Sequence, residues 1–153
     1  MKSLLELYSV LEGKKQYSEE RKTIFDSVSR AAEDLSLRLD NIETEGQQTF
    51  EDGMITCAAL QLSLMALYDR KNRERYTRCA LELMKKHECL EQKLVPDCRM
   101  RGATLRFWES MYDVLINKNM INSPHGWTSW KTYATFYLYL LTCDPIYLQD
   151  TFD

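Results

Sequence analysis

Residues 54–69 read MITCAALQLSLMALYD, a strongly apolar segment that follows a polar connection. Its large apolar side chains recur at helical spacing, and its small residues allow a neighbouring helix to approach closely. A helix with so few charges on any side is typically buried on more than one side. The segment therefore predicts an inner helix of an all-α fold.

Further helices are predicted on both sides of this segment from apolar periodicity and from turn and capping residues. A short helix over residues 2–11 is stopped by Gly13, and a longer one is capped by Ser18 and ends near Leu39. Four more are expected beyond the inner helix, at residues 73–87, 103–115, 128–142 and 146–152.

Charge separates these helices into two kinds. Those that start at Ser18 and Arg73 are rich in charged residues, whereas those that start at Met54 and Trp127 are poor in them. This alternation, with no convincing strand, favours antiparallel helical hairpins packed side by side. The length of 153 residues supports one sizeable core, so we expect a single helical domain over residues 1–153.

Charge and hydropathy exclude several kinds of partner. The net charge is −3, and the basic residues are interleaved with acids, so nucleic-acid binding is not expected. No apolar run reaches the roughly 18 to 20 residues that a membrane span needs. Glu6 and Glu12 interrupt the N-terminal segment, which does not read as a secretion signal. We expect a cytoplasmic chain without membrane contact.

Cysteine and histidine usage gives no sign of a metal or a disulfide framework. The cysteines are odd in number and contain no close pair, and His87 and His125 lie far apart in the sequence. The sequence also lacks a glycine-rich phosphate loop. We expect reduced thiols, no metal and no cofactor.

Five short motifs carry a family resemblance. They are TFEDGM at 49–54, PDCRM at 96–100, TLRFWE at 104–109, SPHGW at 123–127 and YLYLLTxDPxYL at 137–148. Together they resemble the six-hairpin glycosidases, which fold as an (α/α)6 toroid, and most closely the bacterial glucuronyl-hydrolase-like members linked to polysaccharide breakdown. The resemblance covers roughly residues 30–153 and implies a partial toroid of about half the usual size.

The resemblance implies hydrolysis of glycosidic bonds in uronate-containing or similar saccharides. Inverting hydrolysis needs a carboxylic acid that protonates the leaving oxygen and a carboxylate that activates water. The candidate catalytic residues are Asp52, Glu51 and Glu109, with Asp52 preferred. Capping and dipole compensation at the start of a helix is the alternative role for the first two. Glu109 could instead pair with Arg106, which lies one turn away.

The candidate substrate-binding residues are Asp97, Arg99, Arg106, His125, Trp127 and Trp130. Arg99 could hold a uronate carboxylate through a bidentate contact, or pair with Asp97 in a local salt bridge. His125 follows a proline and precedes a glycine, a corner that can hold it at the mouth of a helix as a hydrogen-bond donor. The tryptophans would stack on a sugar face, although we expect Trp130 to pack in the core and Trp127 to be half exposed.

Two departures from the family keep other functions open. The chain offers roughly half the helices of a toroid, and Cys143 stands at a turn where glycine is common, at a cost of about 1 kcal/mol. The main alternative is a non-catalytic helical-repeat module that binds a protein partner or forms a homodimer through the open toroid face. A truncated, inactive chain is the third possibility.

Overall fold

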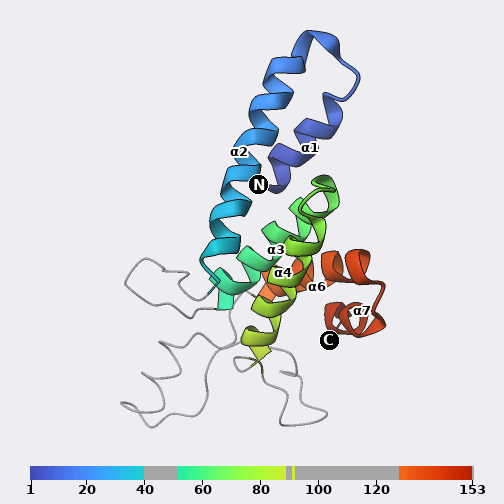
Figure 1. The fold of residues 1–153 in the computed structure, drawn as a ribbon. Helices are drawn as coiled ribbons and strands as arrows, with labels where there is room; N and C mark the ends of the chain where they lie inside the picture. Colours follow the sequence, from blue (N-terminus) through green and yellow to red (C-terminus); the bar gives the residue numbers. More distant parts are fainter. Residues whose placement is uncertain (40–51, 89–90, 92–127, 153) are drawn as a thin grey trace, which may run out of the picture.

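The computed structural model describes residues 1–39, 52–88, 91 and 128–152, and these residues are helical apart from short connections (Figure 1). The all-α prediction is confirmed for this part of the chain. The predicted helix at 103–115 lies outside it. The described elements are α1 Lys2–Val10, a 3₁₀ turn η1 Lys15–Tyr17, α2 Ser18–Leu37, α3 Asp52–Tyr68, α4 Arg73–His87, α6 Thr128–Thr142 and α7 Pro145–Phe152.

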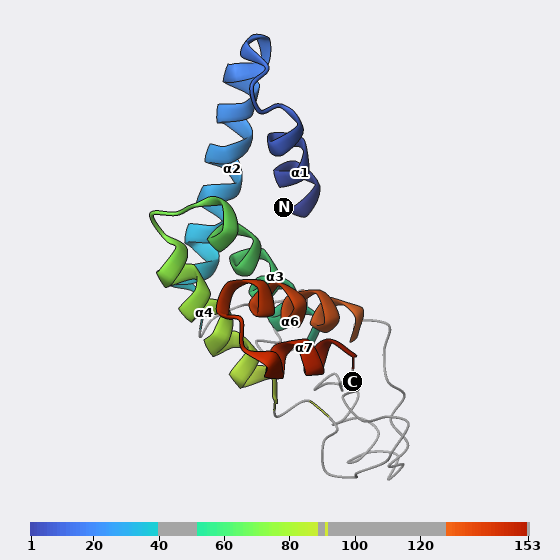
Figure 2. The same ribbon diagram turned by 90° about the vertical axis from the view of Figure 1, so that its right-hand side faces the viewer.

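The helices form hairpins, as predicted. α1 pairs with α2, α3 with α4, and α6 with α7, each through a short connection. The first hairpin stands at one end of the molecule, and the other two pack together below it (Figures 1 and 2). The two inner helices, α3 and α6, lie directly against each other.

The core is centred on α3, which explains why its sequence is apolar on every side. Ile55, Ala59, Leu62 and Met65 are at most 2% exposed. α2, α4 and α6 each contribute further buried residues, and α1 contributes Leu5. A large-to-small change such as Leu62→Ala is therefore expected to cost about 2–5 kcal/mol. The buried side chains that pack against α3 include Leu5, Val28, Ala32, Tyr76, Ala80, Leu83, Met84, Ala134 and Leu138.

The start of α2 differs from the prediction, because Ser18 does not cap it. Gly13 has a φ of +75°, as a chain-breaking glycine should. The chain then passes through η1, where Tyr17 N–H donates to Lys14 O at 3.0 Å. Ser18 follows with helical angles of −61° and −38° rather than the extended conformation that an N-cap adopts. The 3₁₀ turn therefore leads directly into the helix.

The turn between α6 and α7 contains the strained position that the sequence predicts. Cys143 has a φ of 57°, in the left-handed region that favours glycine. Its N–H donates to Tyr139 O at 2.8 Å, which ends α6 with a left-handed cap. Asp144 then starts α7, since its carboxylate accepts the Ile146 N–H at 3.0 Å.

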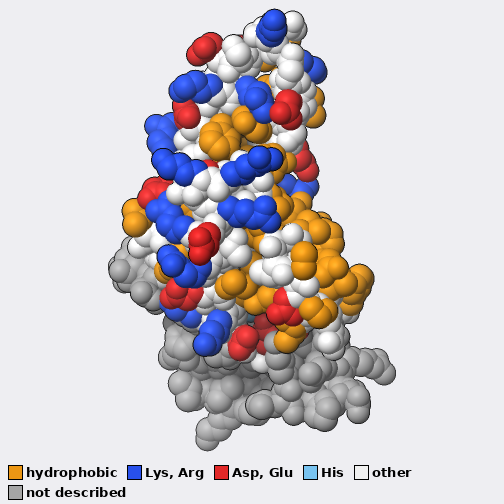
Figure 3. Space-filling model, turned by 45° about the vertical axis from the view of Figure 1, so that its right-hand side comes forward, with side chains coloured by type: hydrophobic (Ala, Val, Ile, Leu, Met, Phe, Trp, Pro, Cys, Tyr) orange, Lys and Arg blue, Asp and Glu red, His pale blue; other side chains and the backbone are white. Residues whose placement is uncertain are grey.

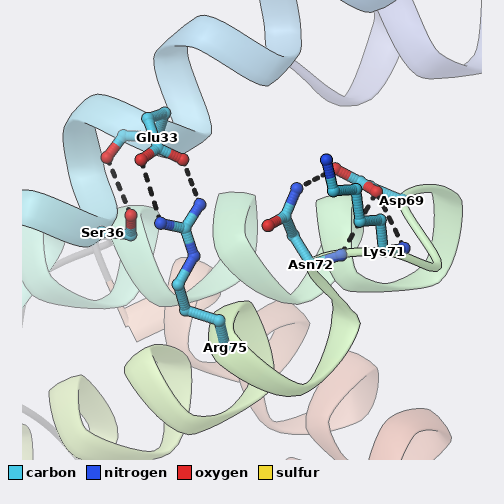
Figure 4. Close-up of polar contacts among 6 residues, drawn as sticks. All are labelled: Glu33, Ser36, Asp69, Lys71, Asn72 and Arg75. Carbon is cyan, nitrogen blue, oxygen red and sulfur yellow. Dashed lines mark hydrogen bonds and ion pairs between the residues drawn. The ribbon is translucent and has the colours of Figure 1, made fainter.

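One ion pair joins the first hairpin to the second (Figure 4). Both terminal guanidinium nitrogens of Arg75, in α4, donate hydrogen bonds to the Glu33 carboxylate of α2, and Nη1 lies 2.9 Å from Oε1. The two side chains are about one third to one half exposed. A bidentate contact of this kind orients α2 on α4, although partial exposure keeps its energy modest.

Candidate functional site

Four helix termini gather at one end of the stacked hairpins. Lys86 Nζ, in the last turn of α4, lies 3.4 Å from the carbonyl oxygen of Leu39, just beyond α2. Because α3 and α4 form an antiparallel hairpin, α3 begins where α4 ends. Lys131, in the first turn of α6, contacts Glu91, which follows α4. We call this the junction end.

A buried charged cluster lies at the junction end. One carboxylate oxygen of Glu91 is 3.0 Å from His87 Nδ1, and the other is 3.3 Å from Lys131 Nζ. The three side chains are only 0–4% exposed. Groups of this kind are stable inside a protein only when they are paired, so the cluster locks the end of α4 to the start of α6.

The cluster borders a groove of about 430 Å³ between α4 and the α6–α7 hairpin. Glu91 and Thr135 line it from the inside, and Thr135 Oγ1 lies 2.9 Å from Thr151 Oγ1 of α7. Around them lie charged and aromatic side chains from both hairpins, namely Arg78, Glu82, Lys85, Glu88, Tyr147 and Asp150. The lining contains four acids, Glu82, Glu88, Glu91 and Asp150, and two cations, Arg78 and Lys85, so the groove is net negative.

The cluster is better suited to holding helices than to reacting with a ligand. His87 is fully buried, and its Nε2 has no hydrogen-bond partner among the described residues. An imidazole beside a carboxylate is a common acid–base pair, but a ligand must come within hydrogen-bonding distance to use it. We therefore regard His87, Glu91 and Lys131 as positioning residues.

Most of the predicted site residues lie outside the described part of the chain. They are Glu51, Asp97, Arg99, Arg106, Glu109, His125 and Trp127. Asp52 is the first residue of α3, where the backbone is described and the side chain is not. Whether these side chains lie close together is therefore not tested by the described residues.

Trp130 is described, and the prediction that it packs in the core is wrong. Its side chain is 37% exposed, on the first turn of α6. The buried residues of α6 are Lys131, Ala134, Thr135 and Leu138, of which Ala134 and Leu138 belong to the core cluster around α3. Trp130 lies outside this buried set, as do Tyr133 and Phe136, which are 50% and 39% exposed. Trp130 is thus accessible to a ligand.

The sequence reasoning missed His87, Glu91 and Lys131. His87 and Glu91 are four residues apart, a spacing at which side chains meet on a helix. Lys131 is a lone cation within a segment of aromatic and apolar residues. These signals could have predicted that Lys131 is buried and needs an acidic partner. Nothing in the sequence indicates which acid that partner is.

Other chemistry has little support among the described residues. No group of three histidine, cysteine or acidic side chains in this part of the chain could hold a metal ion. Burial raises the pKa of the Cys79 thiol, which disfavours the thiolate that a nucleophile needs. Within the same residues, no helix combines the length and the apolar character needed to cross a membrane.

Comparison with known protein families, curated proteins and solved structures found no match. The function must therefore be argued from the residues of this chain.

Proposed function

We propose that the chain is a cytoplasmic carbohydrate-active protein, related to glycoside hydrolases that act on uronate-containing oligosaccharides, with a partial (α/α)6-toroid fold. The observation that supports this proposal is the gathering of helix termini at the junction end. The inner helices α3 and α6 both start there. Asp52 begins the first of them, and His125, Trp127 and Trp130 belong to the segment that begins the second.

The proposed division of labour follows the chemistry of glycoside hydrolysis. Asp52 is the preferred acid–base residue, with Glu51 or Glu109 supplying the second carboxyl group. Arg99 and Arg106 hold the carboxylate of the sugar, which a planar guanidinium can bind through two hydrogen bonds. Asp97 and His125 bond sugar hydroxyls, and Trp127 and Trp130 supply apolar faces. The exposure of Trp130 supports its part of this assignment.

An assay of reducing ends released from uronate-containing oligosaccharides tests the proposal. An uncharged oligosaccharide of the same length serves as the substrate control. We expect turnover of the charged substrate and a loss of kcat of about 100-fold or more in Asp52→Asn, the range for a missing acid–base residue. Asp26→Asn, an exposed change on α2, should leave the rate unchanged. Equal rates for wild type and Asp52→Asn would remove Asp52 from the mechanism, and no turnover by either would remove catalysis.

Self-association is the second candidate function, and the outer face of α6 favours it. Tyr133, Phe136 and Leu140 are 39–50% exposed and follow one another at helical spacing. Ile146 and Phe152 of α7 are more exposed still. Hydrophobic side chains cover much of the α6–α7 surface in Figure 3. Contiguous apolar surface of this kind is typical of an interaction site.

Light scattering during size-exclusion chromatography separates the two candidates. A homodimer through this face should dissociate when Tyr133 and Phe136 are both changed to serine. Leu37→Ser, at a residue of α2 that is 75% exposed, is the matched control and should leave the dimer intact. A wild-type protein that remains monomeric at high concentration would exclude this function.

A further inference from the structure

A second surface of the molecule carries an unusual concentration of positive charge. Residues 70–78 read RKNRERYTR, with five cations and one acid in a chain whose net charge is −3. They form the turn between α3 and α4 and the first turns of α4. Figure 3 shows lysine and arginine side chains spread over the face of α2 and α4.

The neighbouring acids do not neutralise these cations. Asp69 uses its carboxylate to fix the turn, accepting the backbone N–H groups of Lys71 and Asn72 and the Asn72 side-chain amide at 2.8–3.3 Å (Figure 4). Glu33 is occupied by Arg75. Among the described residues, none of the other four cations of this segment takes part in an ion pair.

Those four cations line one open groove of about 520 Å³, the basic groove. Its cationic residues are Arg70, Lys71, Arg73 and Arg78, and the remainder of its lining is Glu74, Thr77 and Leu81. Glu74 is the one acid among these lining residues. The Asp69 hydrogen bonds hold the turn that carries Arg70 and Lys71, so the backbone positions of these cations are fixed.

Helix stability does not explain cations at this place. A helix favours negative charge at its N-terminus and positive charge at its C-terminus. Lys85, Lys86 and His87 at the end of α4 follow that preference, whereas Arg73 at its start opposes it. Asn72 makes no side-chain cap to the first amides of α4. An anion in the groove would neutralise its cations.

We propose that the basic groove binds a carboxylate- or sulfate-bearing polysaccharide segment and anchors it away from the junction end. The saccharide nature of this ligand rests on the proposed function. α4 spans 15 residues, so Arg73 at its start lies about 21 Å along the helix from His87 at its end. Arg78 and Leu81 line both the basic groove and the groove beside α6 and α7. A nucleic acid fits less well, because the whole chain is acidic and the groove lining contains no aromatic residue on which a base could stack.

A fluorescence-anisotropy titration with labelled oligogalacturonate tests this groove directly. A sulfated oligosaccharide, an uncharged oligosaccharide and a single-stranded DNA are run beside it. We expect salt-sensitive binding of either charged saccharide or of both, no binding of the uncharged one, and weaker binding of the DNA. Tighter binding of the DNA, or no binding of a charged saccharide, would overturn the proposal.

Three double variants that each remove two positive charges test whether the saccharide binds in the basic groove. Arg73→Gln with Arg78→Gln should weaken binding about tenfold, as the loss of two exposed charge contacts implies. Arg70→Gln with Lys71→Gln should do the same from the other side of the groove. Lys14→Gln with Lys15→Gln removes equal charge near the α1–α2 turn and should change little. An equal loss in all three variants would show that only total charge matters and would overturn the proposal.

The groove and the proposed catalytic activity can fail separately. If the oligosaccharide is hydrolysed but the groove variants bind it as well as wild type, the proposed binding role of the groove is wrong and the catalytic proposal stands. If the groove variants bind the oligosaccharide more weakly and no turnover is seen, the binding role of the groove stands and the catalytic proposal is wrong.

Discussion

Lys131 Nζ lies 3.3 Å from a carboxylate oxygen of Glu91, although the two side chains are only 4% and 2% exposed. This contact joins the start of α6 to the residue that follows α4, and the second oxygen of Glu91 reaches His87 at the end of α4. Charged groups this deep in a protein are costly unless they remain paired. The contact therefore fixes how the second and third hairpins meet at the junction end.

Lys131→Met should destabilise the protein strongly, because it leaves the buried Glu91 carboxylate without its ammonium partner. Losing one member of a buried pair typically costs about 3–5 kcal/mol. Urea denaturation measures the free energy of unfolding. Lys22→Met, which breaks the exposed Lys22–Asp26 pair on α2, is the control and should cost much less stability. Equal effects of the two changes would contradict the structural role of the cluster.

The Glu33–Arg75 pair should make stability depend on pH. Hydrogen bonds from Arg75 hold the pKa of the Glu33 carboxyl below its ordinary value of 4.5. A folded-state pKa that is lower than the unfolded one adds stability above the unfolded pKa. That contribution is lost as the pH falls through the folded value. Glu33→Gln should therefore reduce the loss of stability on acidification from about pH 5 downward.

Nuclear magnetic resonance titration of the Glu33 carboxyl carbon gives the most direct reading of this pair. Arg75→Gln should raise the pKa of Glu33 toward its ordinary value. Arg78→Gln removes a neighbouring cation of α4 that does not contact Glu33, and should leave that pKa nearly unchanged. A Glu33 pKa that does not respond to Arg75→Gln would rule out the assigned cause.

Cys143→Gly should stabilise the protein by about 1 kcal/mol, because glycine adopts the left-handed turn without a clash at Cβ. Cys143 is exposed, so little packing is lost. Cys143→Ala keeps the Cβ atom and removes only the sulfur, and it should give no such gain. Thermal denaturation compares the three proteins. A glycine variant less stable than wild type would show that the turn carries no strain.

The fold could be predicted wherever a helix shows a clear pattern in sequence. The bounds of α4 match the prediction because its apolar face and its charged face alternate cleanly between Arg73 and His87. The left-handed turn at Cys143 was also predictable, since a tight link between two helices demands it. The prediction that Ser18 caps α2 is wrong, because a serine before two glutamates has the pattern of an N-cap whether or not a 3₁₀ turn precedes it.

The site was harder to predict, because it depends on which helix faces meet. The aromatic spacing of α6 predicts a stripe without indicating whether that stripe turns toward α3 or away from it. The spacing alone thus favours a core position for Trp130, whose side chain is exposed. Glu91 and Lys131 are 40 residues apart in sequence, and no local pattern predicts that their side chains meet.

A titration of tryptophan fluorescence with a uronate oligosaccharide tests the central claim most directly. The chain has three tryptophans, Trp108, Trp127 and Trp130. Trp130, the one whose side chain the structure describes, does not line the basic groove. We predict a saturable change that is smaller in Trp130→Phe and that persists in the variant carrying Arg73→Gln and Arg78→Gln. The absence of any change, while the same oligosaccharide binds the protein in the anisotropy titration, would contradict a saccharide site at the junction end.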